Sequence, residues 1–230
     1  VTVTGLSGGV VTPPVTSGDL ASRFTTFVKF FGSADNSVGL STQARASNFP
    51  LTYPFFITGF ACVLDYDNFG ALCTWGNQSG EEHVIILAQH GRAIAIYWHG
   101  GGEGYFAAVN TPPIGQWAHV TLMVGPPNAA GLLDDFKIVI DGVVSPVLTK
   151  ADSVSDPITP PKTSFSSPTL DLTFGSWGNH APGQGSDADN LNGGLRDWTA
   201  GLGVPTLDEL ARYRNNENPT SIWSVSRVLG

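Results

Sequence analysis

Residues 117–124, Trp-Ala-His-Val-Thr-Leu-Met-Val, and residues 135–143, Asp-Phe-Lys-Ile-Val-Ile-Asp-Gly-Val, decide the fold of this chain. Apolar residues recur at every second position of both stretches, which is the pattern of strands that bury one face. The two apolar series are Ala118, Val120, Leu122 and Val124, then Phe136, Ile138 and Ile140. Asp141-Gly142 is a tight-turn dipeptide, because Asp and Gly accept a positive φ at low cost. The sequence predicts two neighbouring strands, the second ending in a turn.

Strand signals continue on both sides of this pair. Residues 55–65 form an apolar run so continuous that we expect a strand inside a sheet with both faces covered. Residues 145–168 hold five prolines and predict a long connection, because proline removes a donor from the sheet. Further strands are expected on either side of a turn at 35–36, at 70–76, in a meander of 83–88, 93–98 and 105–109, and at 170–175 and 192–198.

The two ends of the chain differ in character. Residues 1–19 are rich in Gly, Thr, Ser and Pro and predict an arm or linker, extended against the domain or a neighbouring chain. Residues 20–230 are expected to form one β-sandwich domain. Near its end, residues 205–215 predict a short helix, because Thr206 can cap its start and Glu209 completes a capping box.

Composition narrows the classes of partner. The net charge is −8 and the eleven Lys and Arg residues are scattered, so no basic field attracts nucleic acid or an anionic membrane. No signal peptide opens the chain, and its apolar runs fall far short of the about 20 residues that span a bilayer. We therefore expect no nucleic-acid partner and no membrane insertion.

The two cysteines allow two interpretations. A hairpin closed by residues 66–69 would place Cys62 directly opposite Cys73, close enough for a disulfide. Alternatively, both are reduced thiols packed as small apolar groups in the same strand pair. Their spacing fits no metal site of the Cys/His type.

The order of several short motifs over residues 24–214 resembles the laminin-G/pentraxin-like branch of the concanavalin A-like proteins. These motifs are a Phe-x-Gly strand with an Asp-rich turn, the Trp117–Val120 strand, the strand ending in Asp141-Gly142, a strand closing in Phe174-Gly175, and Gly-Gly-Leu-x-Asp before a helix. The resemblance implies an all-β fold: a two-sheet antiparallel jelly-roll sandwich with one short C-terminal helix. It names no ligand.

Catalytic patterns of this superfold are absent from the sequence. Its glucanases use Glu-x-Asp-x-x-Glu, because retaining hydrolysis needs two carboxyl groups about 5 Å apart. No such motif occurs here. The polysaccharide lyases of the superfold use Arg, Gln-x-His and Tyr on neighbouring strands, and Gln89-His90 with Tyr105 matches that set only in part. We therefore expect a protein that is not an enzyme, with polysaccharide cleavage as a less favoured alternative.

The polar loop 176–190 is the main site hypothesis. Asp187, Asp189 and Asn190 offer hard oxygen ligands at close spacing, and calcium-binding members of the resembled family hold the ion at an edge of the sandwich. By the same resemblance, Asp35 is a weaker third ligand. Solvated aspartates in a surface loop are the alternative interpretation.

Aromatic residues beside polar ones predict a sugar site, because a pyranose stacks on an indole while amides and carboxylates bind its hydroxyls. The alternative for Trp98 is a place in the core, in phase with Ile94 and Ile96. The groupings are Trp177 with Asn179 and His180, Trp98 with His99 and Glu103, and Tyr66 with Asp67 and Asn68.

Together these features favour a recognition or adhesion module for a cell-surface glycan. The alternative is a structural component of a larger assembly, such as a phage decoration or fibre protein, in which residues 1–19 contact neighbouring subunits. Both interpretations place the protein outside the cell or on a virion surface.

Overall fold

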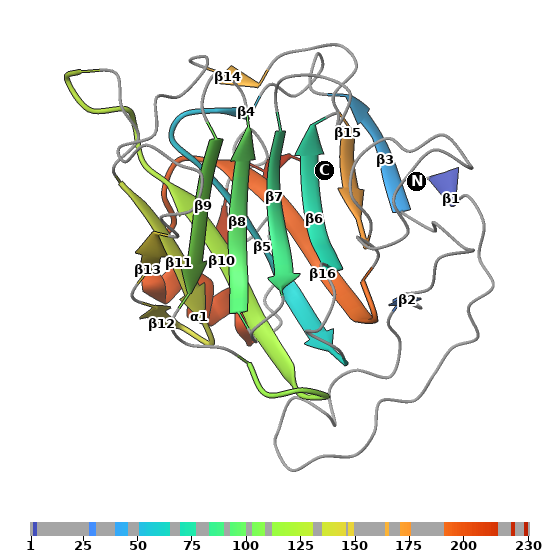
Figure 1. Ribbon diagram of the computed structural model, residues 1–230. Helices are drawn as coiled ribbons and strands as arrows, with labels where there is room; N and C mark the ends of the chain where they lie inside the picture. Colours follow the sequence, from blue (N-terminus) through green and yellow to red (C-terminus); the bar gives the residue numbers. More distant parts are fainter. Residues whose placement is uncertain are drawn as a thin grey trace.

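The computed structural model describes residues 2–3, 28–30, 40–45, 51–64, 70–76, 83–89, 93–99, 103–108, 112–130, 135–145, 147–149, 164–165, 171–175, 191–215, 222–223 and 228–229 of the 230-residue chain. Strands that pair antiparallel dominate this part, together with one short helix (Figure 1). This architecture is consistent with a β-sandwich and confirms the predicted all-β class. No helix in the described part of the chain could cross a membrane.

An eight-stranded sheet lies toward the viewer in Figure 1. Its strands, in spatial order, are β1 (Thr2–Val3), β3 (Leu40–Arg45), β15 (Asp171–Phe174), β6 (Gly70–Gly76), β7 (His83–Gln89), β8 (Ala93–His99), β9 (Glu103–Ala108) and β13 (Val147–Thr149). Strands β7, β8 and β9 are consecutive neighbours, which confirms the predicted meander.

A seven-stranded sheet lies behind it. Its strands, in order, are β12 (Val143–Ser145), β11 (Phe136–Ile140), β10 (Trp117–Val124), β5 (Phe55–Val63), β16 (Gly193–Leu202) and β17 (Val228–Leu229), with β2 (Val28–Phe30) also pairing with β16. A third, two-stranded pair joins β4 (Leu51–Thr52) to β14 (Ser164–Phe165). The predicted connection at 145–168 therefore contains β13, β14 and the last residue of β12, and the two strands around residues 35–36 belong to different sheets.

The two strands predicted at residues 117–124 and 135–143 form and pair with each other as β10 and β11. Thr121 of β10 pairs with Val139 of β11, and Ile140 pairs with Val143 across the Asp141-Gly142 turn. Both turn residues have positive φ, 52° and 82°, which Asp and Gly tolerate. The Asp141 carboxylate also accepts a hydrogen bond from the His119 amide at 2.9 Å, and this bond connects the turn to β10.

Strand β5 is the buried centre of its sheet. All nine of its residues are buried, and β10 and β16 occupy its two sides. This confirms the expectation of a strand with both faces covered. Strand β10 is also buried on both faces, including His119 and Thr121 on the side that lacks the regular apolar series.

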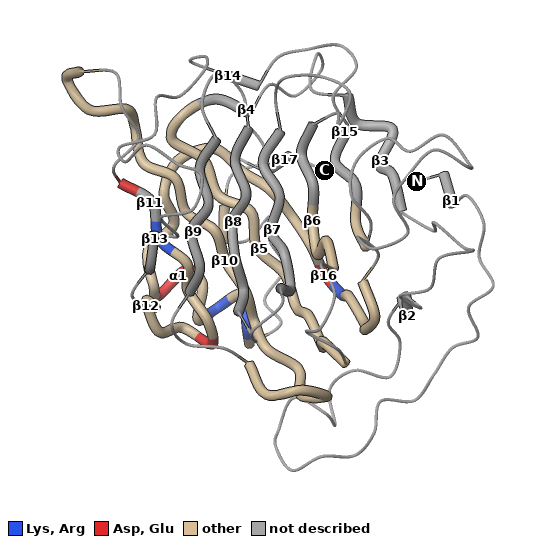
Figure 2. The backbone as a smooth tube through the Cα atoms, in the orientation of Figure 1, with Lys and Arg blue, Asp and Glu red and all other residues tan. Residues whose placement is uncertain are grey.

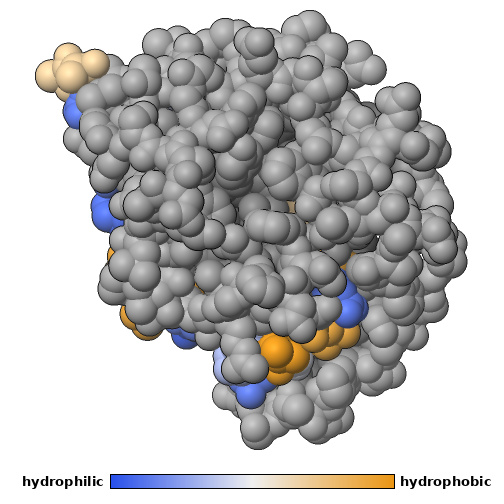
Figure 3. Space-filling view, in the orientation of Figure 1, coloured by the Kyte–Doolittle hydropathy of each residue, from blue (hydrophilic) through white to orange (hydrophobic). Residues whose placement is uncertain are grey.

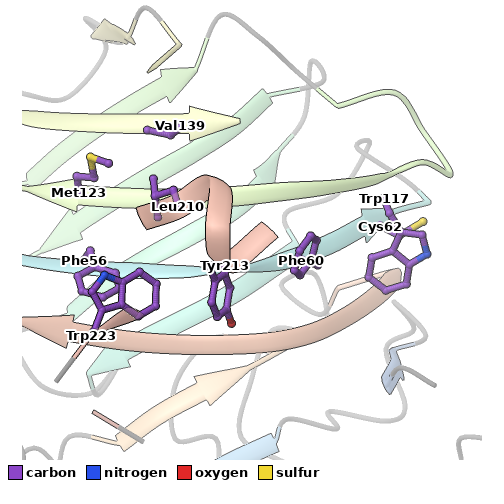
Figure 4. Close-up of a cluster of buried hydrophobic side chains, with 9 residues drawn as sticks. All are labelled: Phe56, Phe60, Cys62, Trp117, Met123, Val139, Leu210, Tyr213 and Trp223. Atoms are coloured by element: carbon purple, nitrogen blue, oxygen red, sulfur yellow. The ribbon is translucent and has the colours of Figure 1, made fainter. Parts of the chain in front are cut away.

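Helix α1 (Leu207–Arg214) explains that second buried face. Thr206 and Glu209 form the predicted capping box, with the Glu209 amide donating to Thr206 Oγ1 at 3.1 Å. Leu210 and Tyr213 are the two buried side chains of the helix, and they pack over β5 and β10 (Figure 4). The cluster beneath and beside the helix is Phe56, Phe60, Cys62, Trp117, Met123, Val139, Leu210, Tyr213 and Trp223.

The predicted hairpin between Cys62 and Cys73 is wrong. Strand β5 pairs with β10 and β16, whereas β6 pairs with β7 and β15 in the other sheet, so the cysteines are not cross-strand partners. Both are buried free thiols. Burial raises the pKa of Cys62 to about 11 and that of Cys73 well above its ordinary value, so both remain protonated at neutral pH. The apolar pattern of the two strands is compatible with a hairpin, but the chain crosses from one sheet to the other between them.

A bulge in β16 brings the two sheets into contact. The register shifts between Arg196 and Thr199, and Asp197 adopts a positive φ of 51°. Trp198 then lies over Gly59 of β5 and donates to the Phe60 carbonyl at 3.0 Å. Its ring centroid is 6.0 Å from that of Phe174 in the other sheet.

Replacing Gly59 should therefore destabilise the fold. A Cβ at this position would overlap Cγ, Cδ2 and Cε2 of the Trp198 ring, which a packed indole cannot easily vacate. We predict that Gly59→Ala lowers the free energy of unfolding by about 1–3 kcal/mol, measured by urea denaturation. The matched control is the same substitution in a Trp198→Leu background, where the cost should fall. An equal cost in both backgrounds would show that the ring overlap is not the cause.

Candidate functional site

One rim of the molecule collects strand ends from both sheets. In the seven-stranded sheet, Gly193 at the start of β16 pairs with Val63 and Phe30, the last residues of β5 and β2. In the eight-stranded sheet, Phe174 at the end of β15 pairs with Leu40, the first residue of β3. These are the lower ends of the strands as they are drawn in Figure 1.

Three backbone hydrogen bonds hold the chain at this rim, and the one from Leu191 to Gly175 links a segment of one sheet to a segment of the other. Gly175 donates to the Leu72 carbonyl at 3.2 Å and accepts from the Leu191 amide at 3.0 Å. Next to it, Leu64 donates to Asn192 at 2.9 Å. Gly175 has a φ of 76°, a conformation suited to glycine, as the chain leaves β15. We call this region the Gly175 rim; it comprises Phe30, Leu40, Val63, Leu64, Leu72, Phe174, Gly175, Leu191, Asn192 and Gly193.

Most of the predicted site residues lie outside the described residues. These are Asp35, Tyr66, Asp67, Asn68, Trp177, Asn179, His180, Asp187, Asp189 and Asn190. The strands that flank them are described, however. Residues 31–39 connect β2 to β3, residues 65–69 follow Leu64, and residues 176–190 lie between Gly175 and Leu191. All three segments are therefore attached to the Gly175 rim.

The second aromatic grouping is attached elsewhere. Trp98 and His99 are the last residues of β8, and His99 pairs with Glu103 of β9 and with His83 of β7. His83 in turn pairs with Gly76 at the far end of β6, six residues from Gly70 at the end near the rim, or roughly 20 Å along the strand. The side chains of Trp98 and His99 are outside the description. Trp98 and His99 therefore lie at the end of β8 that is remote from the Gly175 rim.

The loop before β10 adds surface beside the rim. Gly115 donates to the Val63 carbonyl at 2.8 Å, which holds this loop against the end of β5. Ile114 next to it is 48% exposed. Figure 3 shows hydrophobic surface of described residues at the same lower edge, with hydrophilic residues beside it. A mixture of apolar and polar surface is typical of a site for an amphipathic ligand.

The histidine of strand β10, His119, has a strongly lowered pKa and lies away from any surface. Its side chain is fully buried, and Nε2 shares a hydrogen bond of 2.8 Å with Thr58 Oγ1, which lies 2.6 Å from Thr121 Oγ1. Burial, and secondarily the positive charge of Arg214, lower the pKa of His119 to about 3. A neutral, covered imidazole cannot contact a ligand, so His119 is a structural residue. The sequence did not reveal this role, because the helix that covers it is remote along the chain.

Charged residues of the described part are mixed in sign. They lie on and beside β11, helix α1 and the bulge of β16 (Figure 2). Lys137 pairs with Asp135 at 3.1 Å and Arg196 with Asp197 at 2.8 Å. Within the described ranges, no group of three or more His, Cys, Asp or Glu residues is arranged to hold a metal ion.

Comparison with solved structures shows what this fold resembles. The full-length tailspike protein 2 of an Escherichia coli O157:H7 bacteriophage matches with a TM-score of 0.59 and 16% identity, covering 100% of this chain and 29% of the tailspike. Domain 4 of an extracellular arabinanase from Geobacillus stearothermophilus, in complex with arabinotriose, matches with 0.53 and 13%, covering 90% and 84%. A heptameric pentraxin from Limulus polyphemus matches with 0.52 and 13%, covering 80% and 79%.

At these identities the matches show the fold alone. The chain shares its architecture with a pentraxin, with an arabinanase domain and with part of a tailspike. No family model matches the sequence, and no curated protein matches it.

Proposed function

We propose that this chain is a non-enzymatic recognition module with a concanavalin A-like jelly-roll fold of the laminin-G/pentraxin-like branch, and that its ligand is a surface glycan. The observation that carries the proposal is the attachment of three polar segments to one rim of a fold shared with a pentraxin and an arabinanase domain. Loops on a rigid β scaffold are where such folds place binding residues.

The chemistry of these segments supports a sugar ligand. Trp177 would stack on a pyranose face, while Asn179, His180 and Asn190 would bind its hydroxyls. Asp187 and Asp189, with Asp35 from a second segment at the same rim, would contact the sugar directly or through a calcium ion. The arabinanase domain that shares the fold is described with a bound oligosaccharide.

Recognition without catalysis follows from the missing catalytic carboxylates in the sequence, and it fits a protein that works outside the cell or on a virion surface. Residues 64–67, Leu-Asp-Tyr-Asp, supply an Asp pair without the glutamates of a glucanase. The extracellular arabinanase and the tailspike among the structural matches support this placement.

Sugar binding should depend on Trp177 and not on Trp98. We predict that the protein binds selected glycans on an array and that Trp177→Ala abolishes this binding, because the stacking face is lost. Its effect on stability should stay below the roughly 3–5 kcal/mol of a truncated core aromatic. The matched control is Trp98→Ala, which removes an indole at the opposite end of the eight-stranded sheet.

Two array results would contradict this assignment. Loss of binding with folded Trp98→Ala but not with Trp177→Ala would move the site to the grouping of Trp98 and His99. An absence of any sugar preference in the folded wild-type protein would refute the glycan proposal.

Calcium binding should distinguish between the two roles proposed for the aspartates, which are direct contact with the sugar and contact through a calcium ion. If a bridging ion is present, Asp187→Ala should lose both calcium and sugar binding, measured by calorimetric titration with each ligand. If Asp187 contacts the sugar directly, the variant should lose sugar binding alone. Unchanged binding of both ligands would remove Asp187 from the site, and Asp35→Ala tests the third proposed ligand in the same way.

An assembly component is the second candidate function. The tailspike match covers this whole chain but only 29% of the tailspike, as expected for one module of a long assembly protein. Residues 1–19 would then bind neighbouring subunits. Within the described residues, Thr2 and Val3 pair with Ser41 and Leu40 at the edge of the eight-stranded sheet.

Deleting residues 1–19 tests this role. We predict that native mass spectrometry of the full chain shows an oligomer that the truncated chain does not form. The melting temperature of the monomeric domain should change little, because β1 pairs over only two residues. A monomeric full chain, or a drop of many degrees on truncation, would contradict the assembly role of the arm.

A further inference from the structure

The side chain of His119 is enclosed between a sheet and a helix. Its ring centroid lies 5.0 Å from that of Phe60 in β5 and 5.6 Å from that of Tyr213 in α1. Tyr213 also stacks on Phe60 at 6.3 Å and contacts Trp223 at 5.4 Å. The helix is therefore the cover that separates this imidazole from water.

The enclosure suits only the neutral imidazole. Nε2 shares a hydrogen bond with Thr58, whereas Nδ1 is buried and has no hydrogen-bond partner among the described residues. When the ring takes up a proton from water, both nitrogens become donors, and the one at Nδ1 finds no acceptor. A buried donor without a partner is costly, and a buried charge is more so.

Within the described part of the chain, no carboxylate is hydrogen-bonded to the ring. Titratable and charged groups on the elements around it are Tyr213 and Arg214 from α1, Asp141 from the turn after β11, and Arg196 and Asp197 from β16. Asp141 Oδ1 accepts from the backbone amide of His119. Asp197 pairs with Arg196 at 2.8 Å. Arg214 carries a positive charge and further disfavours a protonated His119.

Among the elements around the ring, α1 is held most weakly. It has eight residues and buries only Leu210 and Tyr213. Near its C-terminal end, Tyr213 donates a hydrogen bond to the Asp197 carbonyl and Arg214 donates one to the Asp141 carbonyl. Strands β5 and β10, by contrast, are hydrogen-bonded to neighbours on both sides. A short helix without its packing is marginal in water, so it opens more readily than the sheet.

We propose that α1 is an acid-sensitive cover: protonation of His119 releases the helix from the seven-stranded sheet and exposes the apolar face beneath it. The exposed face would include Phe56, Phe60 and Met123, which are fully or almost fully buried while the helix is in place. In the open state His119 is hydrated and holds its proton without cost.

The direction of the pH dependence follows from linkage. Because the covered ring has a pKa of about 3 against 6.5 for an exposed one, closure is fully stabilised above pH 6.5 and weakens as the pH falls toward 3. The population of the open state should rise on the order of tenfold for each pH unit in this window.

Hydrogen exchange of the full chain, followed by mass spectrometry between pH 7.5 and 4.5 and corrected for intrinsic rates, tests the proposal. Peptides covering residues 207–214 should lose protection by on the order of 100-fold between pH 6.5 and 4.5. Peptides from β5 and β10 should keep theirs. In His119→Gln, which cannot titrate, the helix should show a much smaller change.

His119→Phe is a second variant that cannot titrate and retains a ring between Phe60 and Tyr213, in case the glutamine variant does not fold. All these proteins carry the same carboxylates, so the difference in pH dependence between wild type and variant isolates His119. Equal pH dependence in wild type and variants would overturn the proposal. Simultaneous loss of protection in α1, β5 and β10 would overturn it too, since that is global acid unfolding.

Discussion

The burial of β5 on both faces is the constraint on which the rest of this structure depends. Nine consecutive buried residues need one cover on each side, because an apolar strand face left in water forfeits about 25 cal/mol for each Å². Trp198 of β16 lies over one face at Gly59, and helix α1 covers the other. Gly59 lets the Trp198 ring approach the backbone on the first side, and Leu210 and Tyr213 pack on the second.

The same constraint determines where function can reside. With both faces of the central strands occupied, His119 and the threonines around it serve stability and are closed to ligands. Surface chemistry is therefore left to the rims, where strands from the two sheets end. At the Gly175 rim a backbone hydrogen bond from Leu191 to Gly175 links the sheets, and a rigid base of this kind lets attached segments vary without loss of the fold.

Local patterns predicted well wherever neighbouring residues make the interaction. The Asp141-Gly142 turn, the capping box of Thr206 and Glu209, and the meander of β7 to β9 each depend on residues close in sequence. The hairpin between Cys62 and Cys73 was wrong, because two strands adjacent in sequence can enter different sheets without any change in their apolar pattern. No local sequence pattern predicted the bulge that directs Trp198 onto Gly59.

The sequence by itself determined the all-β class, the β10–β11 pair and its turn, the buried central strand and the start of the helix. The periodicities and turn preferences behind them act over a few residues. Only the tertiary structure decided which sheet each strand joins, that α1 covers His119, and that segments holding Asp35, Asp67 and Asp187 are attached to one rim while Trp98 belongs to the other end. These outcomes depend on contacts between residues tens to more than a hundred positions apart, and no local pattern records them.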